Sequence, residues 1–508
     1  MEHRSPLGRR AGLLLPLSSV RGPRGDLGSY ADAGGVARYL ASAGCTLWQL
    51  LPLNEVAPGQ DSPYAASSSN ALEPVYIDLD SIEGLTLESG ERARLDRLRD
   101  EKTVDFGGYR AVKFSAIARA WKSFPRDGER FCELSRFREE HRAWVEDYAI
   151  YRALHDERQK SWRDWEPALR DREPHALSRA RERLRDKVDE LVFAQWVADQ
   201  QWREGRRAAN EQGVKVVGDL PFMVAEDSAD VWGLQQLFRF DATVGVPPDA
   251  YSKDGQDWGL PVPRWEEMHA RGDPWLRPRA ARAAELYDAF RVDHVVGLYR
   301  TYARPLDKSA PFFTPAVEAE QRAQGERILA LMGERAEVLA EDLGTVPDFV
   351  RASLAEIEVP GTKVLRWEND QGVPRDVTGF STVSLAVTGT HDTDSLFTWW
   401  EELPLWEREQ QLTQPPLVRL RGPSQTRFTP QTKSALLELA YQSASDALLT
   451  PITDALGWPD RMNTPGTVGT HNWTFRLPWK LDELMAAPET VAVARELASL
   501  AERHGRKR

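Results

Sequence analysis

The sequence predicts an α/β fold, a (β/α)8 TIM barrel that carries large helical and loop insertions between its strands. Short apolar runs recur along the chain and alternate with longer segments of helical periodicity. These runs are continuous rather than alternating, which is typical of strands buried on both faces of a parallel sheet. The chain has 508 residues, whereas a plain barrel needs about 250, so we expect the surplus to lie in insertions.

Eight apolar runs qualify as barrel strands. They lie at residues 12–16, 47–52, 214–221, 290–295, 338–341, 362–367, 383–388 and, as the weakest of the eight, 461–463. The first run has an alternative interpretation, because Arg9 and Arg10 followed by the apolar stretch 11–17 also resemble the start of an export signal. We expect a buried first strand there, and a cytoplasmic protein.

Two segments hold most of the surplus length. Residues 55–212 follow the second strand candidate, and their apolar residues recur at helical spacing, so a mostly helical subdomain is expected. Residues 223–288 follow the third candidate and include the Pro- and Gly-rich run 246–263, which predicts a functional loop subdomain. Because no linker-like stretch separates these segments from the strands, we predict one domain over residues 1–508.

The composition argues against several classes of partner. The net charge is −12 and the isoelectric point is near 5.5, so we expect neither nucleic acid nor an anionic membrane as a partner. No stretch approaches 18 uninterrupted apolar residues, which predicts no transmembrane helix. The two cysteines, Cys45 and Cys132, are too few for a disulfide framework. A neutral substrate fits best, and the sequence leaves the oligomeric state open.

Acidic residues lie where four of the predicted strands end. Asp293 and Glu341 close two of the apolar runs, Asp392 follows a third, and Asp219 lies near the end of a fourth. The active site of such a barrel lies at the carboxyl ends of its strands, so these side chains are expected to converge. A single acid in this position can equally cap the following helix, but several together favour a site.

Convergent carboxylates favour glycosyl transfer. One carboxylate attacks the anomeric carbon, and a second protonates the leaving oxygen and later acts as a base. Burial and a neighbouring negative charge raise the pKa of such an acid, while a nearby cation keeps the nucleophile ionised. Arg291 lies two residues before Asp293 and therefore points to the same side of the strand, which makes it the predicted cation.

A metal site is the alternative use of these residues. The pairs His391-Asp392 and Asp293-His294 could be ligands in a barrel metallohydrolase. However, the sequence lacks a His-Glu-x-x-His motif, and no His-x-His closes the first strand candidate. A serine nucleophile is disfavoured as well, because there is no Gly-x-Ser-x-Gly motif. We therefore predict that the chain uses no metal and no cofactor.

Seven blocks of sequence, in order, resemble the amylomaltases, the disproportionating 4-α-glucanotransferases of glycoside hydrolase family 77. The resemblance covers nearly the whole chain. The blocks are WQLLPL at 48–53 with DSPY at 61–64, GDLPF at 218–222 with VAEDSADVW at 224–232, VPPD at 246–249 with GQDWG at 255–259, RVDH at 291–294, AEDLG at 340–344, THD at 390–392 and RMNTPG at 461–466.

This resemblance implies a barrel of the α-amylase-like clan and a retaining transfer reaction without a cofactor. The implied substrates are α-1,4-glucans and malto-oligosaccharides, with glucose among the acceptors. Asp293 would be the nucleophile, Glu341 the general acid/base, and Asp392 would stabilise the distorted sugar of the transition state. The implied substrate-binding residues are Tyr64, Asp219, Asp249, Gln256, Trp258, Arg291, His294 and His391.

The resemblance also divides these binding residues by role. Tyr64 would stack on the donor sugar, around which Arg291 and the two histidines bind and orient. Asp219 and Asp249 would hydrogen-bond to sugar hydroxyls, while Gln256 and Trp258 lie where the acceptor chain passes.

Two other functions remain open from the sequence. An α-glucan hydrolase would use the same carboxylates through the same covalent intermediate, so residue spacing does not separate hydrolysis from transfer. The second alternative is a glycan-binding protein that has the fold of an enzyme but has lost the catalytic activity. The presence of all three carboxylates, Asp293, Glu341 and Asp392, argues against it.

Overall fold

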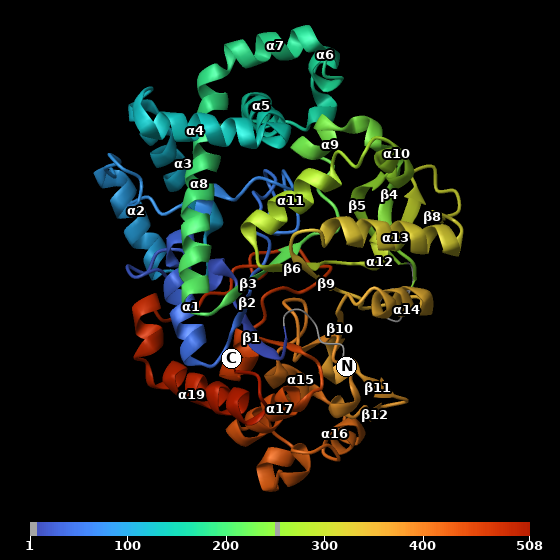
Figure 1. Cartoon of the computed structure of the whole chain (residues 1–508). Coiled ribbons are helices and arrows are strands. Elements are labelled where there is room, and N and C mark those ends of the chain that lie inside the picture. The colour runs from blue at the N-terminus through green and yellow to red at the C-terminus, as the bar shows by residue number, and fades with distance from the viewer. Residues whose placement is uncertain (1–7, 249–254, 508) are drawn as a thin grey trace.

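The computed structural model describes residues 8–248 and 255–507, and its centre is a closed barrel of eight parallel strands (Figure 1). Around the barrel the strands follow the order β1-β14-β13-β10-β9-β6-β3-β2. Their bounds are β1 Arg10–Leu14, β2 Leu47–Gln49, β3 Lys215–Leu220, β6 Ala289–Val292, β9 Glu337–Ala340, β10 Gly361–Val364, β13 Ser384–Val387 and β14 Ala447–Pro451. The predicted (β/α)8 fold is confirmed.

The eighth strand is not where the sequence predicted it. The other seven candidates overlap barrel strands, but the prediction at 461–463 is wrong, because those residues form a loop. The strand is β14, whose five residues are all buried and pair with β1 on one side and β13 on the other. It therefore closes the barrel, and its short apolar run Ala-Leu-Leu at 447–449 is the signal that predicted strands of this kind elsewhere.

The barrel interior is a packed core of aliphatic side chains. Seven of the eight strands contribute to it, and the contributing residues are Leu47, Val217, Ala289, Leu339, Val364, Leu385, Val387, Ala447 and Leu449. Strand β1 lies very close to β2 at Gly12, where an added Cβ would be 2.1 Å from the carbonyl oxygen of Leu47. We infer that β1 and β2 can pair at this distance only because position 12 lacks a side chain.

Helices surround the barrel and fill the segment between β2 and β3. The helices are α1 Ala33–Ser42, α2 Ser89–Asp100, α3 Phe106–Ser123, α4 Gly128–Glu140, α5 Arg142–Arg158, α6 Pro167–Arg170, α7 Pro174–Arg183, α8 Arg185–Glu211, α9 Ala229–Gly233, α10 Trp265–Ala270, α11 Leu276–Leu286, α12 Val296–Tyr299, α13 Glu318–Met332, α14 Asp348–Glu356, α15 Leu396–Glu402, α16 Leu405–Gln411, α17 Pro430–Gln442, α18 Ile452–Leu456 and α19 Pro488–Arg503.

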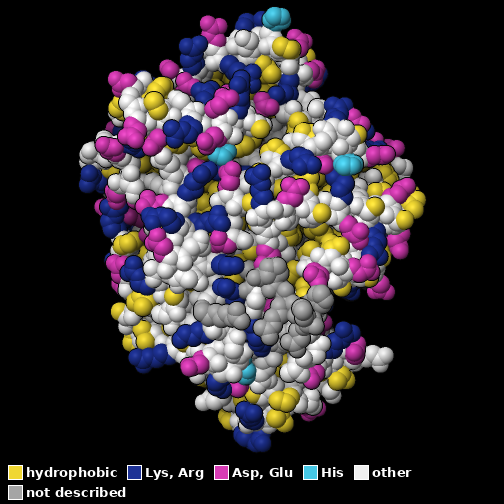
Figure 2. All heavy atoms as spheres, in the orientation of Figure 1, with side chains coloured by type: hydrophobic (Ala, Val, Ile, Leu, Met, Phe, Trp, Pro, Cys, Tyr) yellow, Lys and Arg dark blue, Asp and Glu magenta, His cyan; other side chains and the backbone are white. Residues whose placement is uncertain are grey.

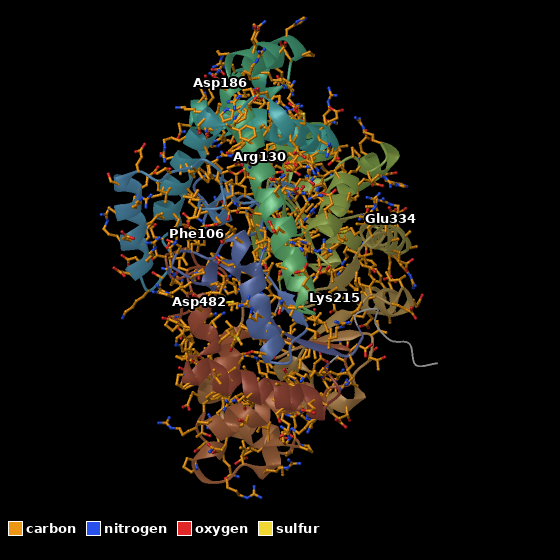
Figure 3. All side chains as sticks on the ribbon, turned by 60° about the vertical axis from the view of Figure 1, so that its left-hand side comes forward. Phe106, Arg130, Asp186, Lys215, Glu334 and Asp482 are labelled. Carbon is orange, nitrogen blue, oxygen red and sulfur yellow. The ribbon has the colours of Figure 1, made fainter. Side chains whose placement is uncertain are left out.

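The long helix α8 connects the helical segment to the barrel. Figure 3 shows it running from near Asp186, at its start, towards Lys215, the first residue of β3. It packs against α5 at one end and α1 at the other. The aromatic side chains of Trp144, Tyr148 and Trp196 are buried in this segment.

A small antiparallel sheet lies beside the barrel. Its strands follow the order β5-β4-β7-β8. They are β4 Phe238–Val246, β5 Gln256–Pro263, β7 Thr301–Pro305 and β8 Phe312–Thr314. The sheet joins residues of the predicted loop segment 223–288 to residues that follow β6, and β4 and β5 flank the part of the chain outside the described residues.

The remaining observations concern the surface and the cysteines. Figure 2 shows positive and negative side chains interspersed over one face of the molecule. Cys45 is buried and Cys132 is exposed, and both are free thiols. Among the described helices, none is both long and apolar enough to cross a bilayer. The stretch that also resembled an export signal forms β1 of the barrel.

Candidate active site

The carboxyl ends of the barrel strands bring the predicted acids together. Asp219 lies in β3 directly opposite Arg291 in β6, and Val292 is paired with Ala340 in β9. Asp293 and Glu341 therefore follow neighbouring strands at the same level of the barrel. This placement is what the parallel register requires, because strand ends in a barrel share one edge.

One guanidinium group connects these carboxylates. Nη1 of Arg291 donates to both carboxylate oxygens of Asp219, at 2.8 and 2.9 Å. Nη2 lies 2.8 Å from Oδ1 of Asp293 and 4.0 Å from Oε2 of Glu341. Arg291 is buried, and a buried cation is stable only with such partners. Its two terminal nitrogens thus connect Asp293 to Asp219, and Asp219 fixes the guanidinium in place.

Glu341 is held by the backbone of the two adjoining loops. Its carboxylate accepts hydrogen bonds from the N–H of His294 at 2.7 Å and from that of Leu343 at 2.9 Å. His294 has a φ of +48°, in the left-handed region, and this turn aims its N–H at Glu341. Burial raises the pKa of Glu341 to about 7, since desolvation and the charge of Asp293 outweigh the attraction of Arg291.

Asp392 has the opposite electrostatic environment. Its Oδ2 lies 3.2 Å from Nε2 of His391, and its Oδ1 accepts a hydrogen bond from the side-chain amide of Asn463 at 2.6 Å. Burial by itself would raise the pKa of Asp392, but the His391 charge and these two hydrogen bonds hold that pKa well below its usual range. The site therefore pairs an acid that is about half protonated at neutral pH with one that is ionised there.

Tyr64 links the two halves of this arrangement. Its hydroxyl donates to Oδ2 of Asp219 at 2.9 Å, and its ring stacks on His391 with centroids 5.1 Å apart. Trp473 packs against both rings, with centroid distances of 5.7 Å to each. Asp219 has no exposed surface, so its side chain acts on the site through Tyr64 and Arg291.

The other predicted binding residues lie along the cleft or outside the described residues. The Trp258 ring packs edge-on against His294, with centroids 4.8 Å apart, and its indole N–H donates to Oε1 of Gln256 at 3.2 Å. Gln256 is exposed at the start of β5. Asp249 lies outside the described residues, so its predicted role carries no structural observation.

Three residues of the site were given no role in the sequence analysis, and all lie far along the chain. Asn463 belongs to the segment that was predicted as a strand, whereas its amide holds Asp392. Arg461 of the same loop donates to the backbone oxygen of Asp392 at 2.6 Å and pairs with Asp394. The motif RMNTPG was the signal for this loop, but no pattern pointed to Trp473.

The three carboxylates line an open cleft of about 730 Å³. Trp258 and Arg291 line it on the β6 side, and Trp367 lines it beyond β10. The space is large enough for several sugar rings, and it is lined by carboxylates and flat rings. This combination suits a neutral, hydroxyl-rich ligand and acid–base attack on a bond between two sugars.

One group of side chains elsewhere has the composition of a metal site. His141, Asp199 and Glu285 place potential ligand atoms within 4.8 Å of one another. However, Arg282 pairs with both carboxylates, at 2.9 Å for Glu285, and Arg203 lies 2.7 Å from Asp199. Arginine cations therefore compensate the negative charge that would attract a metal ion. The group belongs to helices α8 and α11 and the end of α4, outside the cleft.

Comparison with known proteins agrees with this geometry. The family model for 4-alpha-glucanotransferase matches residues 15–482. A 4-alpha-glucanotransferase from Thermus thermophilus is 33% identical over 524 residues, covering 98% of this chain and 99% of the relative. A chloroplastic/amyloplastic 4-alpha-glucanotransferase from Oryza sativa subsp. japonica is 32% identical over 515 residues, with 97% and 83% covered.

A solved structure shows the same architecture. The amylomaltase from Streptococcus agalactiae in complex with acarbose matches with a TM-score of 0.84 at 25% sequence identity, covering 98% of this chain and 100% of that one.

Proposed function

This chain belongs to the 4-alpha-glucanotransferase family, glycoside hydrolase family 77, and from that premise we propose how its residues perform the reaction. It is an enzyme that cuts an α-1,4-glucan and rejoins the donor piece to another sugar. Asp293 is the nucleophile, Glu341 the general acid/base and Asp392 the stabiliser of the transition state. This assignment rests on the position of Arg291. Its guanidinium lies 2.8 Å from Asp293, the proposed nucleophile, and 4.0 Å from Glu341, whose pKa is about 7.

In the first half-reaction the donor glucan is cut. The carboxylate of Asp293 attacks the anomeric carbon, while protonated Glu341 gives its proton to the leaving 4-oxygen. The bond from the anomeric carbon to that oxygen breaks, and a glycosyl ester of Asp293 forms. Arg291 contributes by orienting the attacking carboxylate through the 2.8 Å contact between its Nη2 and Oδ1 of Asp293.

In the second half-reaction the glycosyl group moves to an acceptor. Glu341 is now ionised and removes the proton from the 4-hydroxyl of the acceptor sugar, whose oxygen attacks the anomeric carbon of the ester. The ester bond to Asp293 breaks, and the α-configuration is restored by the second inversion. Glu341 suits both steps because an acid with a pKa of about 7 exchanges its proton readily near neutral pH.

The surrounding residues bind the donor sugar. Asp392, held ionised by His391 and Asn463, accepts hydrogen bonds from its hydroxyls and favours the distorted ring. Tyr64 presents its ring to the sugar, while Asp219 keeps Tyr64 and Arg291 in position.

The acceptor chain and the setting of the enzyme complete the proposal. Gln256 and Trp258 line the acceptor path, and Asp249 binds hydroxyls from the segment between β4 and β5. The substrates are α-1,4-glucans and malto-oligosaccharides, with glucose as an acceptor, in keeping with the acarbose complex of the Streptococcus agalactiae amylomaltase.

The free thiols of Cys45 and Cys132 support a reducing, cytoplasmic setting.

The product pattern separates transfer from hydrolysis. Incubated with maltotriose alone, the enzyme should release glucose and build a ladder of longer dextrins while the total number of reducing ends stays constant. Chromatography by chain length, with a reducing-end assay on the same samples, measures both. Reducing ends that rise with every cut would instead identify a hydrolase, and unchanged maltotriose and longer glucans would identify a binding protein.

The pH dependence should follow Glu341. The acid must carry its proton to release the leaving oxygen, so kcat/KM for maltotriose should fall as pH rises through about 7. The decrease should approach tenfold per pH unit above that point. A donor with a fluoride leaving group needs no proton. At saturating donor, when glycosylation limits the rate, its rate of fluoride release should therefore not decrease above pH 7. A maltotriose profile that stays flat to pH 9 would contradict the assignment of Glu341.

A further inference from the structure

An exposed group of apolar side chains lies outside the cleft, around Trp406. This residue is in α16 and is 58% exposed, next to Leu405, which is 63% exposed. Val373, which is 54% exposed, belongs to the neighbouring hairpin. Large apolar side chains gathered in this way on a surface mark a binding site more often than isolated ones do.

Trp406 rests on a two-stranded hairpin formed by β11 Asn369–Asp370 and β12 Val373–Pro374. Its ring lies against the turn, since a side chain added at Gly372 would begin 3.2 Å from Cζ3 of Trp406. Figure 1 shows α16 beside these strands, which project from the body of the molecule.

Internal hydrogen bonds brace the hairpin. The Gly372 N–H donates to the side chain of Asn369 at 3.1 Å, and Arg375 pairs with Asp370 at 2.8 Å. The ring is thus presented on a braced support, so it need not lose much conformational freedom when a ligand binds.

The hairpin borders the active-site cleft. Trp367, two residues before β11, lines the cleft and is 44% exposed. Asn369 and Arg375, from the two ends of the hairpin, line it as well. The base of the hairpin therefore forms part of the cleft wall, and Trp406 lies at the turn of the same hairpin, beyond the residues that line the cleft.

This end of the cleft is on the side of the acid. The hairpin follows β10, which lies between β13, the strand before His391 and Asp392, and β9, the strand before Glu341. Asp293 follows β6 on the far side of β9, so Glu341 lies between Asp293 and the hairpin in the order of the strands. Tyr64 and His391, the proposed donor-side residues, form a cluster with Trp473. A glycosidic oxygen protonated by Glu341 therefore directs the leaving chain, and later the acceptor chain, towards the hairpin.

We propose that Trp406 and Trp367, on either side of this hairpin, form an outer subsite that binds the far sugars of a long α-1,4-glucan acceptor. The inference rests on the proposed function and extends it to chain-length preference. Flat indole rings stack on the apolar faces of sugars, and a chain that leaves the cleft over Trp367 continues towards Trp406. Glucose occupies only the position next to Glu341, whereas a chain of seven sugars extends along the hairpin.

The test compares short and long acceptors with one donor. Maltotriosyl fluoride at saturation supplies the glycosyl group, and the acceptor KM is measured for glucose and for maltoheptaose. In Trp406→Ala the ratio of the maltoheptaose KM to the glucose KM should rise about three- to tenfold over wild type. Trp406→Phe, which keeps a flat ring, should restore most of the difference.

Leu306→Ala is the matched control. Leu306 is 61% exposed just after β7, and its N–H donates a hydrogen bond to the backbone oxygen of Asp241 in β4. Its KM ratio should equal that of wild type. A ratio within twofold of wild type in Trp406→Ala, or an equal rise in Leu306→Ala, would overturn the proposal.

Two further outcomes are distinguishable. An unchanged KM ratio together with an altered mass of Trp406→Ala in light scattering would make this face a contact between copies and overturn the glucan subsite. If wild type itself transfers nothing from the fluoride to either acceptor, the proposed function fails first and the subsite falls with it.

Discussion

Asp293→Asn should lower kcat/KM for maltotriose by about 10⁴- to 10⁶-fold, the loss that removal of a covalent nucleophile causes. The amide has nearly the same shape as the carboxylate but cannot form the glycosyl ester. Arg291 keeps both hydrogen bonds to Asp219, so the fold and the donor site should persist. Stopped assays over hours, with a detection limit below one part in 10⁴ of wild type, are required.

Covalent labelling gives a second readout of the same prediction. A fluorinated glucosyl fluoride should form the glycosyl ester, which then breaks down slowly. The mass of the sugar should be found on the wild-type peptide that contains Asp293, and Asp293→Asn should not be labelled. Asp307→Asn, at an exposed position beyond β7, is the matched control and should behave as wild type. A label on another residue, or more than about 1% residual activity, would reject Asp293 as the nucleophile.

Asp293→Asn also tests the binding-protein alternative. Titration calorimetry with maltoheptaose should give similar affinity for the variant and for wild type, because the donor and acceptor contacts remain. If binding is intact in both and wild type has no turnover to lose, the scaffold binds glucans without cutting them.

Glu341→Gln should reduce kcat/KM for maltotriose by about 10²- to 10⁴-fold, the usual contribution of a general acid/base. The glutamine side chain can accept the backbone hydrogen bonds of His294 and Leu343 through only one oxygen, and it has no proton to give. Its rate should also lose the fall above pH 7 that wild type shows, since the titrating group is gone.

Rescue distinguishes this role from a structural one. Maltotriosyl fluoride should restore the first half-reaction in Glu341→Gln, because fluoride leaves without protonation. Azide, which needs no base, should then accelerate the second and give a glycosyl azide. Glu356→Gln, in α14 beyond the same loop, is the matched control and should need neither compound. If neither compound restores any rate, Glu341 is not the acid/base.

Several features of the site follow from sequence alone because they depend on local geometry. A strand alternates its side chains, so Arg291 and Asp293 had to point the same way, and the structure places them 2.8 Å apart. Strands of a parallel barrel all end at one edge, which is why the acids after separate apolar runs could be expected to meet. Continuous apolar runs predicted seven of the eight strands, because strands of a parallel barrel are buried on both faces.

The tertiary structure decided what depends on contacts between distant segments. Asp342 follows Glu341 directly in sequence, yet it accepts a hydrogen bond from Thr362 in β10 while Glu341 faces the cleft. The pKa of Glu341 near 7 comes from burial and from Asp293, two features that only packing supplies. Equally, the pKa of Asp392 is lowered first by His391, its neighbour in sequence, and then by the hydrogen bond from Asn463, which lies in a different loop.

The sequence by itself thus determined the barrel, its carboxylate set and the cation beside Asp293, because backbone periodicity and parallel register translate directly into position. It did not determine the eighth strand, since the local pattern does not decide between residues 461–463 and the short apolar run at 447–449. Closure of the barrel decides that competition: β14 pairs with both β1 and β13, and the loop at 461–463 then lies over Asp392. Local rules place side chains along each strand, and only the closed barrel decides which distant loops complete the site.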